Sequence, residues 1–170
     1  ADMQIEENLA IASRRGKIPG LAWRSKASQR EKFREMVAEL DLGLEDRLSS
    51  KVGLLSGGQR QAVTLLMATI NKPKLLLLDE HTAALDPKTA AKVLELTERI
   101  VERDKLTTLM ITHNMRDALR CGNRLIMLHN GQIIIDVAGE EKKNLDVPDL
   151  LKMFEKASGA EMANDRMLLG

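Results

Sequence analysis

The feature that most constrains the fold is a pair of short apolar runs with one helical segment between them. The run LLLL at residues 75–78 is apolar on both faces and too short for a helix, which is typical of a central strand in a parallel sheet. Asp86 followed by Pro87 indicates a helix start, because a capping residue precedes proline at the first helical position. The run TTLMIT at residues 107–112 predicts the next strand, and a short helix is expected over residues 115–120. This order predicts an α/β fold in which helices flank the sheet.

Helices are also predicted before this pair of strands. From Ile5 onward the apolar residues recur at helical spacing. A second helix is expected to start at a capping box of Ser28 and Glu31 and to end near Gly43. A third is expected from Gln59 onward. The first third of the chain is therefore expected to be helical.

The far end of the chain predicts a hairpin. Asn130 with Gly131 is the strongest short hairpin signal, and it separates the apolar runs RLIMLH and QIIIDV. After the charged run GEEKKN at residues 139–144, one more helix is expected after Pro148. Weak order is expected beyond Ser158.

Composition and charge exclude several classes of protein. The 170 residues fit about one domain, and an apolar content of 44% is enough to build a core. A net charge of +1 and an aromatic content of 2% disfavour nucleic acid as a partner. The single cysteine, Cys121, rules out an internal disulfide framework and suits a reducing compartment. No run approaches the ~18 apolar residues of a membrane span, and the start lacks a signal-peptide pattern, so a cytosolic chain is expected.

Two glycines stand in the first turn of the third predicted helix, although each costs about 1 kcal/mol against alanine there. Ser56 and Gln59 already provide the capping box that would start this helix. A helix N-terminus carries unpaired N–H groups and partial positive charge, and the absence of side chains lets an anion approach the backbone closely. We therefore interpret Ser56, Gly57 and Gly58 as suited to phosphate oxygens. An ordinary capped helix explains Ser56 and Gln59 but not the doubled glycine.

Polar side chains follow both predicted parallel strands. Asp79 and Glu80 end the first strand, and His113 follows the second. Ligands of open α/β sheets bind beyond the carboxyl ends of the strands, so these residues are candidates for a site. Taken alone, the carboxylate pair is also compatible with a solvated turn, and the histidine with a surface imidazole.

With these residues in view, the sequence resembles the nucleotide-binding domain of ABC transporters. LSGGQ at residues 55–59 is similar to the family signature, and LLLLDE at 75–80 is similar to Walker B with its catalytic glutamate. ALD at 84–86 resembles the D-loop, and His113 in ITHN resembles the switch histidine. The resemblance extends from residue 1 to about 155. Within the family, the chain looks most like the ATPase subunits of bacterial importers often assigned to aromatic amino acids.

The resemblance implies a fold and a division of the chain. It implies part of a P-loop NTPase, with a RecA-like parallel sheet core, an inserted α-helical subdomain and a C-terminal hairpin. Residues 1–54 would be the helical subdomain that faces the permease, 55–140 the C-terminal part of the ATPase core, and 141–170 a C-terminal helix and tail.

The resemblance also implies a role for each candidate residue. Asp79 would hold Mg²⁺ through a water, and Glu80 would orient and deprotonate the attacking water. His113 would meet the γ-phosphate and link it to Glu80. The residues expected to bind ATP, partly across a subunit contact, are Ser56, Gly57, Gly58, Gln59 and Asp86.

Two features depart from the family pattern. The sequence has no P-loop of the form G-x-x-x-x-G-K-[ST], since the only Gly-Lys pair, Gly16 with Lys17, is followed by Ile18. Because the chain also begins with Ala1, we expect it to be the C-terminal part of a longer, N-terminally truncated protein, and we expect this chain alone to be inactive. His81 stands where the family usually has proline, and its role is open.

The function implied is that of an ATP-binding subunit that couples ATP hydrolysis to solute transport. Its expected cofactors are ATP and Mg²⁺. Its expected partners are a second nucleotide-binding subunit, with a homodimer favoured, and a transmembrane permease at the cytoplasmic face of the membrane; no nucleic acid is expected. The alternatives are a soluble ABC ATPase of the translation or DNA-repair type and a non-catalytic fragment. The transported solute cannot be read from these residues.

Overall fold

The computed structural model describes residues 2–16 and 26–158. The chain divides into two compact units, Ala1–Leu109 and Met110–Gly170, which are described separately below. The expectation of weak order beyond Ser158 lies outside the described residues. The functional division at residues 54 and 140 stays a prediction.

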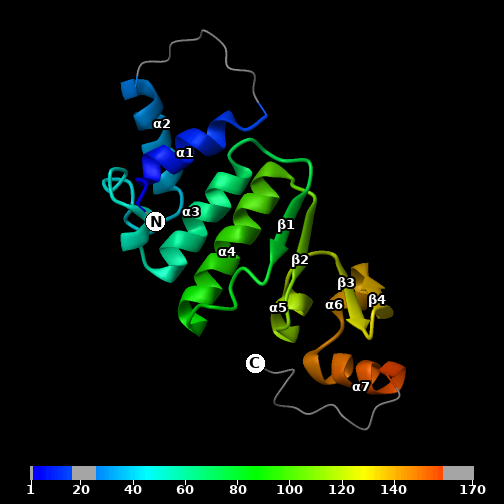
Figure 1. Ribbon diagram of the computed structural model, residues 1–170. Helices are drawn as coiled ribbons and strands as arrows, with labels where there is room; N and C mark the ends of the chain where they lie inside the picture. The colour runs from blue at the N-terminus through cyan, green and yellow to red at the C-terminus, as the bar shows by residue number, and fades with distance from the viewer. Residues whose placement is uncertain (1, 17–25, 159–170) are drawn as a thin grey trace. The chain divides into compact units, whose positions relative to one another are not determined.

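The first unit is mainly helical and contains one strand and the first half of a second, whose last two residues belong to the second unit (Figure 1). Helices α1 and α2 both contact α3, and α3 contacts α4. The strand β1 precedes α4, and β2 follows it. The elements are α1 (Ile5–Arg14), α2 (Lys26–Ala38), the 3₁₀ helix η1 (Val52–Leu54), α3 (Gly57–Thr69), β1 (Leu76–Asp79), α4 (Pro87–Asp104) and β2 (Thr108–Ile111).

Helix α1 forms where the apolar spacing predicts it. Ile5, Leu9 and Ala12 lie on one face and are fully buried. Its first turn is closed by a capping box, because Gln4 at the N-cap and Glu7 bond to each other's backbone. The expected helix is confirmed.

Helix α2 begins earlier than the sequence suggests. It starts at Lys26, so Ser28 lies inside the helix rather than at its N-cap, and the predicted capping box with Glu31 does not start it. Phe33 and Val37 are buried on the expected apolar stripe. The capping pattern is a local signal, and here it does not decide where the helix starts.

The start of α4 is confirmed. Asp86 is the N-cap and its carboxylate accepts the backbone N–H of Thr89 at 3.1 Å, while Pro87 occupies the first helical position. The side chains of Val93, Leu94 and Ile100 are buried along one stripe. This amphipathic pattern holds α4 against α3.

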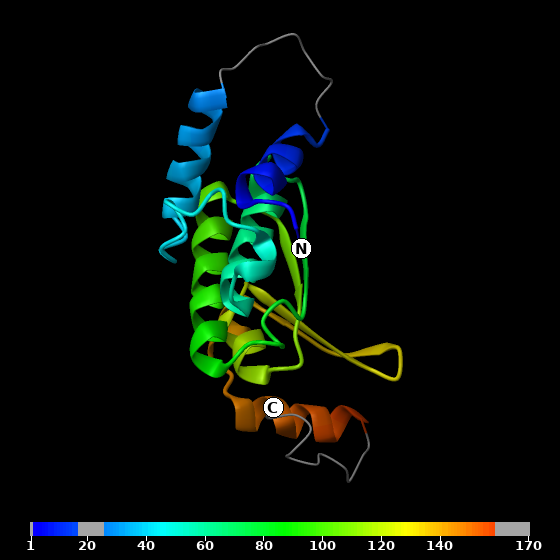
Figure 2. The same cartoon turned by 60° about the vertical axis from the view of Figure 1, so that its left-hand side comes forward.

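Strand β1 pairs in parallel with β2, as the order of elements predicts. The N–H of Leu76 donates to the carbonyl of Thr107 at 2.9 Å. The expectation that the leucine run is covered on both faces is wrong for the described residues, since Leu76 and Leu78 are buried but Leu77 is 65% exposed. Both views place α3 and α4 on one side of β1 (Figures 1 and 2).

The second unit contains the predicted hairpin. Its strands pair antiparallel, with a register shift between Met127 and Leu128. Asn130 and Gly131 have φ angles of 48° and 76°, as a two-residue turn with two left-handed positions requires. The elements are α5 (Met115–Arg120), β3 (Arg124–His129), β4 (Gln132–Ala138), α6 (Gly139–Lys143) and α7 (Val147–Ser158).

The charged run after β4 forms a short helix, α6, which the sequence did not predict. Lys142 in α6 is 3% exposed, and its ammonium donates to the carbonyls of Leu119, Cys121 and Gly122 at 2.7, 2.6 and 2.9 Å. A lysine that satisfies three carbonyls can be buried, whereas a charged run normally indicates a solvated segment.

The core of the second unit lies among α5, the hairpin and α7. Helix α7 contacts both α5 and β4. Within the described ranges of the chain, no helix is long and apolar enough to cross a membrane. The buried core residues are Met115, Leu125, Ile135, Val137 and Leu150.

Candidate functional site

The predicted capping box at the start of α3 is present. Ser56 is the N-cap, and its hydroxyl accepts the N–H of Gln59 at 3.3 Å. The Gln59 side chain returns the bond, since its Oε1 accepts the N–H of Ser56 at 3.1 Å. This reciprocal pair leaves the N–H groups of Gly57 and Gly58 without a hydrogen-bond partner among the described residues. Of the two, Gly57 is exposed, so its N–H group is available at the positive end of the α3 dipole.

The two glycines differ in their surroundings. Gly58 is buried, and a β-carbon added there would lie 2.2 Å from the methyl carbon of Thr89 on α4. Gly57 is exposed, and a β-carbon there would lie 3.0 Å from the far end of the Leu85 side chain. Close packing of α3 on α4 is therefore a sufficient reason for glycine at position 58. At Gly57 only the far end of a flexible side chain would have to move, so packing alone does not require glycine there.

The Gln59 side chain also connects the signature segment, residues 55–59, to the chain that follows α2. Its Nε2 donates to the carbonyl of Leu42 at 3.3 Å. Gln59 thus uses both ends of its amide, one on the cap and one on a segment remote in sequence. The main-chain carbonyl of Leu42 carries no sequence signal, so this contact is not predictable from the residues.

Asp79 and Glu80 lie at the carboxyl end of β1, and both are exposed. Glu80 has a φ of 43°, in the left-handed region that non-glycine residues seldom adopt. The chain turns sharply there, with the N–H of Ala83 donating to the carbonyl of Glu80 at 3.0 Å. The turn directs two adjacent carboxylates away from the strand and toward solvent.

His81, the departure from the family pattern, contacts α4. Its Nε2 lies 3.1 Å from the hydroxyl of Thr97, and that hydroxyl donates to the carbonyl of Val93 at 2.8 Å. Because the hydroxyl proton is used on Val93, the bond from His81 is best made by an Nε2–H that donates to the Thr97 oxygen. His81 thereby ties the turn after Glu80 to α4.

Asp86, expected to act across a subunit contact, caps α4 in this structure. Hydrogen bonds from the Thr89 hydroxyl and then from the Thr89 N–H hold the pKa of the Asp86 carboxyl below its usual range. Asp86 is exposed and lies in the chain between Leu85 and Thr89, the residues nearest to Gly57 and Gly58. The structure thus brings the signature segment and the start of α4 together within the first unit.

His113 belongs to the second unit, where it is exposed and immediately precedes the cap of α5. Asn114 is the N-cap, and its side chain accepts the N–H groups of Arg116 and Asp117 at 3.0 and 3.3 Å. The N–H of Asn114 donates to the Thr112 hydroxyl at 3.1 Å. These bonds fix the backbone on both sides of His113.

The residues of the first unit fit the groups that the motifs imply. The exposed Gly57 offers a backbone N–H group with no β-carbon in front of it, which suits phosphate oxygens. No cluster of three or more His, Cys, Asp or Glu side chains that could hold a metal occurs in the described part of the chain. A single exposed carboxylate such as Asp79 suits Mg²⁺, because that ion takes one or two carboxylates and completes its shell with water and substrate phosphates.

The chain is similar to ATP-binding proteins of transporters. The family model described as ABC transporter matches residues 1–83. The tyrosine transport ATP-binding protein of Clostridioides difficile is 48% identical over 157 residues, which make up 91% of this chain and 61% of that protein. The thiamine import ATP-binding protein ThiQ of Photobacterium profundum is 39% identical over 145 residues, 82% of this chain and 57% of that protein.

A solved structure of an ATP-binding cassette of an ABC transporter superposes with a TM-score of 0.67 at 28% identity. The match covers 89% of this chain and 62% of that one. The chain thus spans about three fifths of the length of these relatives. Their names agree with the motifs found in the sequence, and the chain belongs to the family of ABC transporter ATP-binding domains.

Proposed function

We propose that this chain is the signature-bearing part of an ATP-binding subunit that couples ATP hydrolysis to solute import. The observation that carries the proposal is the start of α3, where a complete Ser56–Gln59 capping box presents the N–H groups of Gly57 and Gly58. A second copy of the subunit would supply the remaining nucleotide contacts. The transport roles of the relatives, which include tyrosine and thiamine, support an importer.

In this proposal, each exposed polar residue has one task. Asp79 would hold Mg²⁺, whose charge stabilises the transferring phosphoryl group. Glu80 would orient the attacking water and accept its proton at the carboxylate, and His113 would hydrogen-bond the γ-phosphate. Asp86 would contact the opposite subunit from its position at the α4 cap. Phosphoryl transfer depends mainly on positioning and charge, so few residues suffice.

The proposed subunit would act with two partners at a membrane. A second ATP-binding subunit, in a homodimer, and a transmembrane permease would complete the transporter, and the subunit would act at the cytoplasmic face of the membrane. Residues 1–54 would face the permease. The relative with a tyrosine transport name and the resemblance to aromatic amino acid importers make an aromatic amino acid the first solute to test.

The test compares ATP hydrolysis by the assembled transporter that contains this chain with hydrolysis by its Glu80→Gln variant. Loss of the general base is expected to lower kcat by about 10²-fold or more. Glu102→Gln is the matched control, since Glu102 is an exposed glutamate on α4 outside the proposed site. Equal rates for the Glu80 variant and the parent would contradict the proposal.

A further inference from the structure

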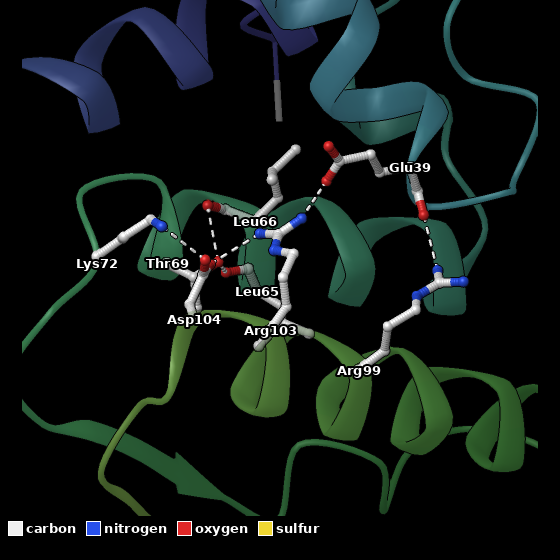
Figure 3. Close-up of polar contacts among 8 residues, drawn as sticks. All are labelled: Glu39, Leu65, Leu66, Thr69, Lys72, Arg99, Arg103 and Asp104. Carbon is white, nitrogen blue, oxygen red and sulfur yellow. Dashed lines mark hydrogen bonds and ion pairs between the residues drawn. The ribbon is translucent and has the colours of Figure 1, made fainter.

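A set of polar contacts joins the end of α2 to α4 within the first unit (Figure 3). Arg99 donates from Nη2 to the main-chain carbonyl of Glu39 at 2.7 Å. Arg103, one turn further along α4, pairs through Nη1 with the carboxylate of Glu39. Glu39 is therefore held at its backbone and at its side chain by two residues on one face of α4. We call Glu39, Arg99 and Arg103 the Glu39 brace.

The Glu39 brace is itself anchored. The other guanidinium nitrogen of Arg103 donates to Asp104 at 2.8 Å, and Lys72 pairs with the second oxygen of the same carboxylate at 2.8 Å. Asp104 is only 4% exposed at its side chain. A nearly buried carboxylate with two cations fixes the direction of Arg103, so the contact with Glu39 is less free to rearrange than an isolated surface pair.

The segment that follows Glu39 is hydrogen-bonded to the signature segment. The N–H of Asp41 donates to the carbonyl of Ala38 at 3.0 Å, and Asp41 has a φ of 55°, so the chain turns sharply after α2. The next residue, Leu42, accepts the Gln59 side chain at 3.3 Å. The same Gln59 closes the cap with Ser56. Glu39 of the brace and Leu42, which accepts the Gln59 side chain, thus lie on one short stretch of chain.

Packing holds this segment on both sides of Leu42, since Leu40 is 4% exposed and Leu44 is fully buried. A cavity of ≈ 300 Å³ lies between the segment and α4. Its walls include Leu42 and Gln59 on one side and Leu96 and Arg99 on the other. Leu42 itself lines this cavity and packs less closely there, so the hydrogen bond from Gln59 adds to what fixes its position.

We propose that the Glu39 brace positions the signature segment for nucleotide, by fixing Leu42 so that its carbonyl receives Gln59. The brace acts through Leu42 and Gln59 and does not touch nucleotide. The expected effect on ATP hydrolysis rests on the proposed function. The positioning of the signature segment by the brace does not depend on it. Glu39, Arg99 and Arg103 are positioning residues.

The first arm of the test measures backbone order by ¹⁵N NMR relaxation in the 170-residue chain. Glu39→Ala and Arg99→Met are expected to lower the order parameters of Ser56, Gly57 and Gln59 from about 0.85 to below about 0.6. Glu39→Gln keeps an acceptor of the same shape and is expected to give a smaller change. Glu39→Gln also replaces Glu39→Ala in the test if the alanine variant does not fold.

The matched control is Arg34→Met. Arg34 lies on α2 and donates to Asp46 at 2.8 Å, with side-chain exposures of 50% and 77% against 46% and 56% for the Arg103 and Glu39 pair. Its ion pair joins two residues that both precede α3. Unchanged order at residues 56–59 in the Glu39 and Arg99 variants would overturn the proposal. An equal fall in Arg34→Met would do the same, because it would reflect general loosening.

The second arm measures ATP dependence in the assembled transporter. If the brace variants leave the signature segment competent about one fifth of the time, the ATP concentration for half-maximal hydrolysis rises about fivefold, while kcat changes less. Lys143→Met, which removes an exposed ion pair outside residues 1–54, should leave it unchanged. Lower order with no change in ATP dependence overturns the proposal, provided that Glu80→Gln abolishes hydrolysis. If Glu80→Gln has no effect, the proposed function fails, and the NMR arm alone decides whether the brace positions the segment.

Discussion

The methyl group of Thr89 occupies the space that a side chain on Gly58 would need. A β-carbon built on Gly58 lies 2.2 Å from that methyl carbon but 3.7 Å from the β-carbon of Thr89. The Thr89 hydroxyl bonds to Asp86, and a β-branched side chain in a helix has few rotamers, so the methyl group cannot turn away freely. Thr89 thus bonds to Asp86, the N-cap of α4, and also sets the close approach of α3.

This relationship predicts that alanine destabilises the fold much more at position 58 than at position 57. Gly58→Ala is expected to destabilise the first unit by roughly 1–3 kcal/mol through overpacking. Gly57→Ala should change stability by less than about 1 kcal/mol, because only the flexible end of Leu85 must move. Urea unfolding followed by far-UV circular dichroism measures both.

A double variant isolates the cause. Thr89→Ser removes the methyl group and keeps the hydroxyl that bonds Asp86, so it should restore most of the stability lost in Gly58→Ala. In that background the nearest atoms to the new β-carbon lie 3.7 and 3.9 Å away, which is ordinary contact. Additive losses in the double variant would mean that Thr89 is not what excludes a side chain at position 58.

The Asp104 carboxylate predicts a pH-dependent contribution to stability. The bond from Arg103 and then the bond from Lys72 hold the pKa of Asp104 below its usual value of 3.8. Since its pKa is lowered in the folded state, the stabilisation is fully present above about pH 4 and is lost as pH falls through the folded-state pKa. Asp104→Asn is therefore expected to lower the free energy of unfolding by roughly 1–3 kcal/mol at pH 7.

The measurement is urea unfolding of parent and Asp104→Asn at pH 7, 5 and 2.5. The difference between them should be equal at pH 7 and 5 and smaller at pH 2.5. Lys72→Met removes one of the two cations and should give part of the loss at pH 7. A difference that stays constant down to pH 2.5 would show that the charge on Asp104 is not its source.

Lys142 predicts a large effect in the second unit from a residue in a charged run. Its ammonium satisfies three carbonyls around the end of α5, so Lys142→Met would leave three acceptors without that donor. The expected loss is roughly 2–4 kcal/mol. The neighbouring Lys143 makes only an exposed pair with Glu140, so Lys143→Met should cost less than about 1 kcal/mol. Thermal unfolding compares the two variants. Similar melting temperatures for Lys142→Met and Lys143→Met would show that the buried bonds of Lys142 do not stabilise the second unit.

These cases show which parts of the structure are readable from sequence. Local signals succeeded where the bond partners are close in the chain, as with the cap at Asp86, the cap at Ser56 and the turn at Asn130. They failed for α6, because the burial of Lys142 depends on carbonyls far along the chain. Capping and turn chemistry are local, whereas burial of a charge is decided by tertiary contacts.

The candidate site divides in the same way. The motifs placed Gly57 and Asp79 on the expected elements, since a helix start and a strand end follow from local pattern. The reason for Gly58 and the bond from Gln59 to Leu42 come from segments that meet only in the folded unit. The sequence therefore placed the candidate residues on their elements but did not predict the contacts around them.

The exposed Gly57 predicts a change in ATP use without a change in folding. An alanine methyl group there would stand beside the N–H that we propose meets phosphate, and the loss of one preorganised donor typically costs about 10²-fold in kcat. Hydrolysis by the assembled transporter carrying Gly57→Ala should fall accordingly, while urea unfolding of the chain stays near that of the parent. Full activity in this variant would argue against backbone contact at Gly57.

The 170-residue chain by itself is expected not to hydrolyse ATP. Phosphoryl transfer requires the β- and γ-phosphates to be held in line with the attacking water, and in P-loop enzymes the amides of G-x-x-x-x-G-K-[ST] provide that hold. This sequence contains no such motif. Under the proposed function, a second subunit would hold the nucleotide that meets Gly57. Purified chain should therefore show no Mg²⁺-dependent phosphate release above the level of its Glu80→Gln variant. Turnover that Glu80→Gln abolishes would mean that the described residues hold the nucleotide without a P-loop.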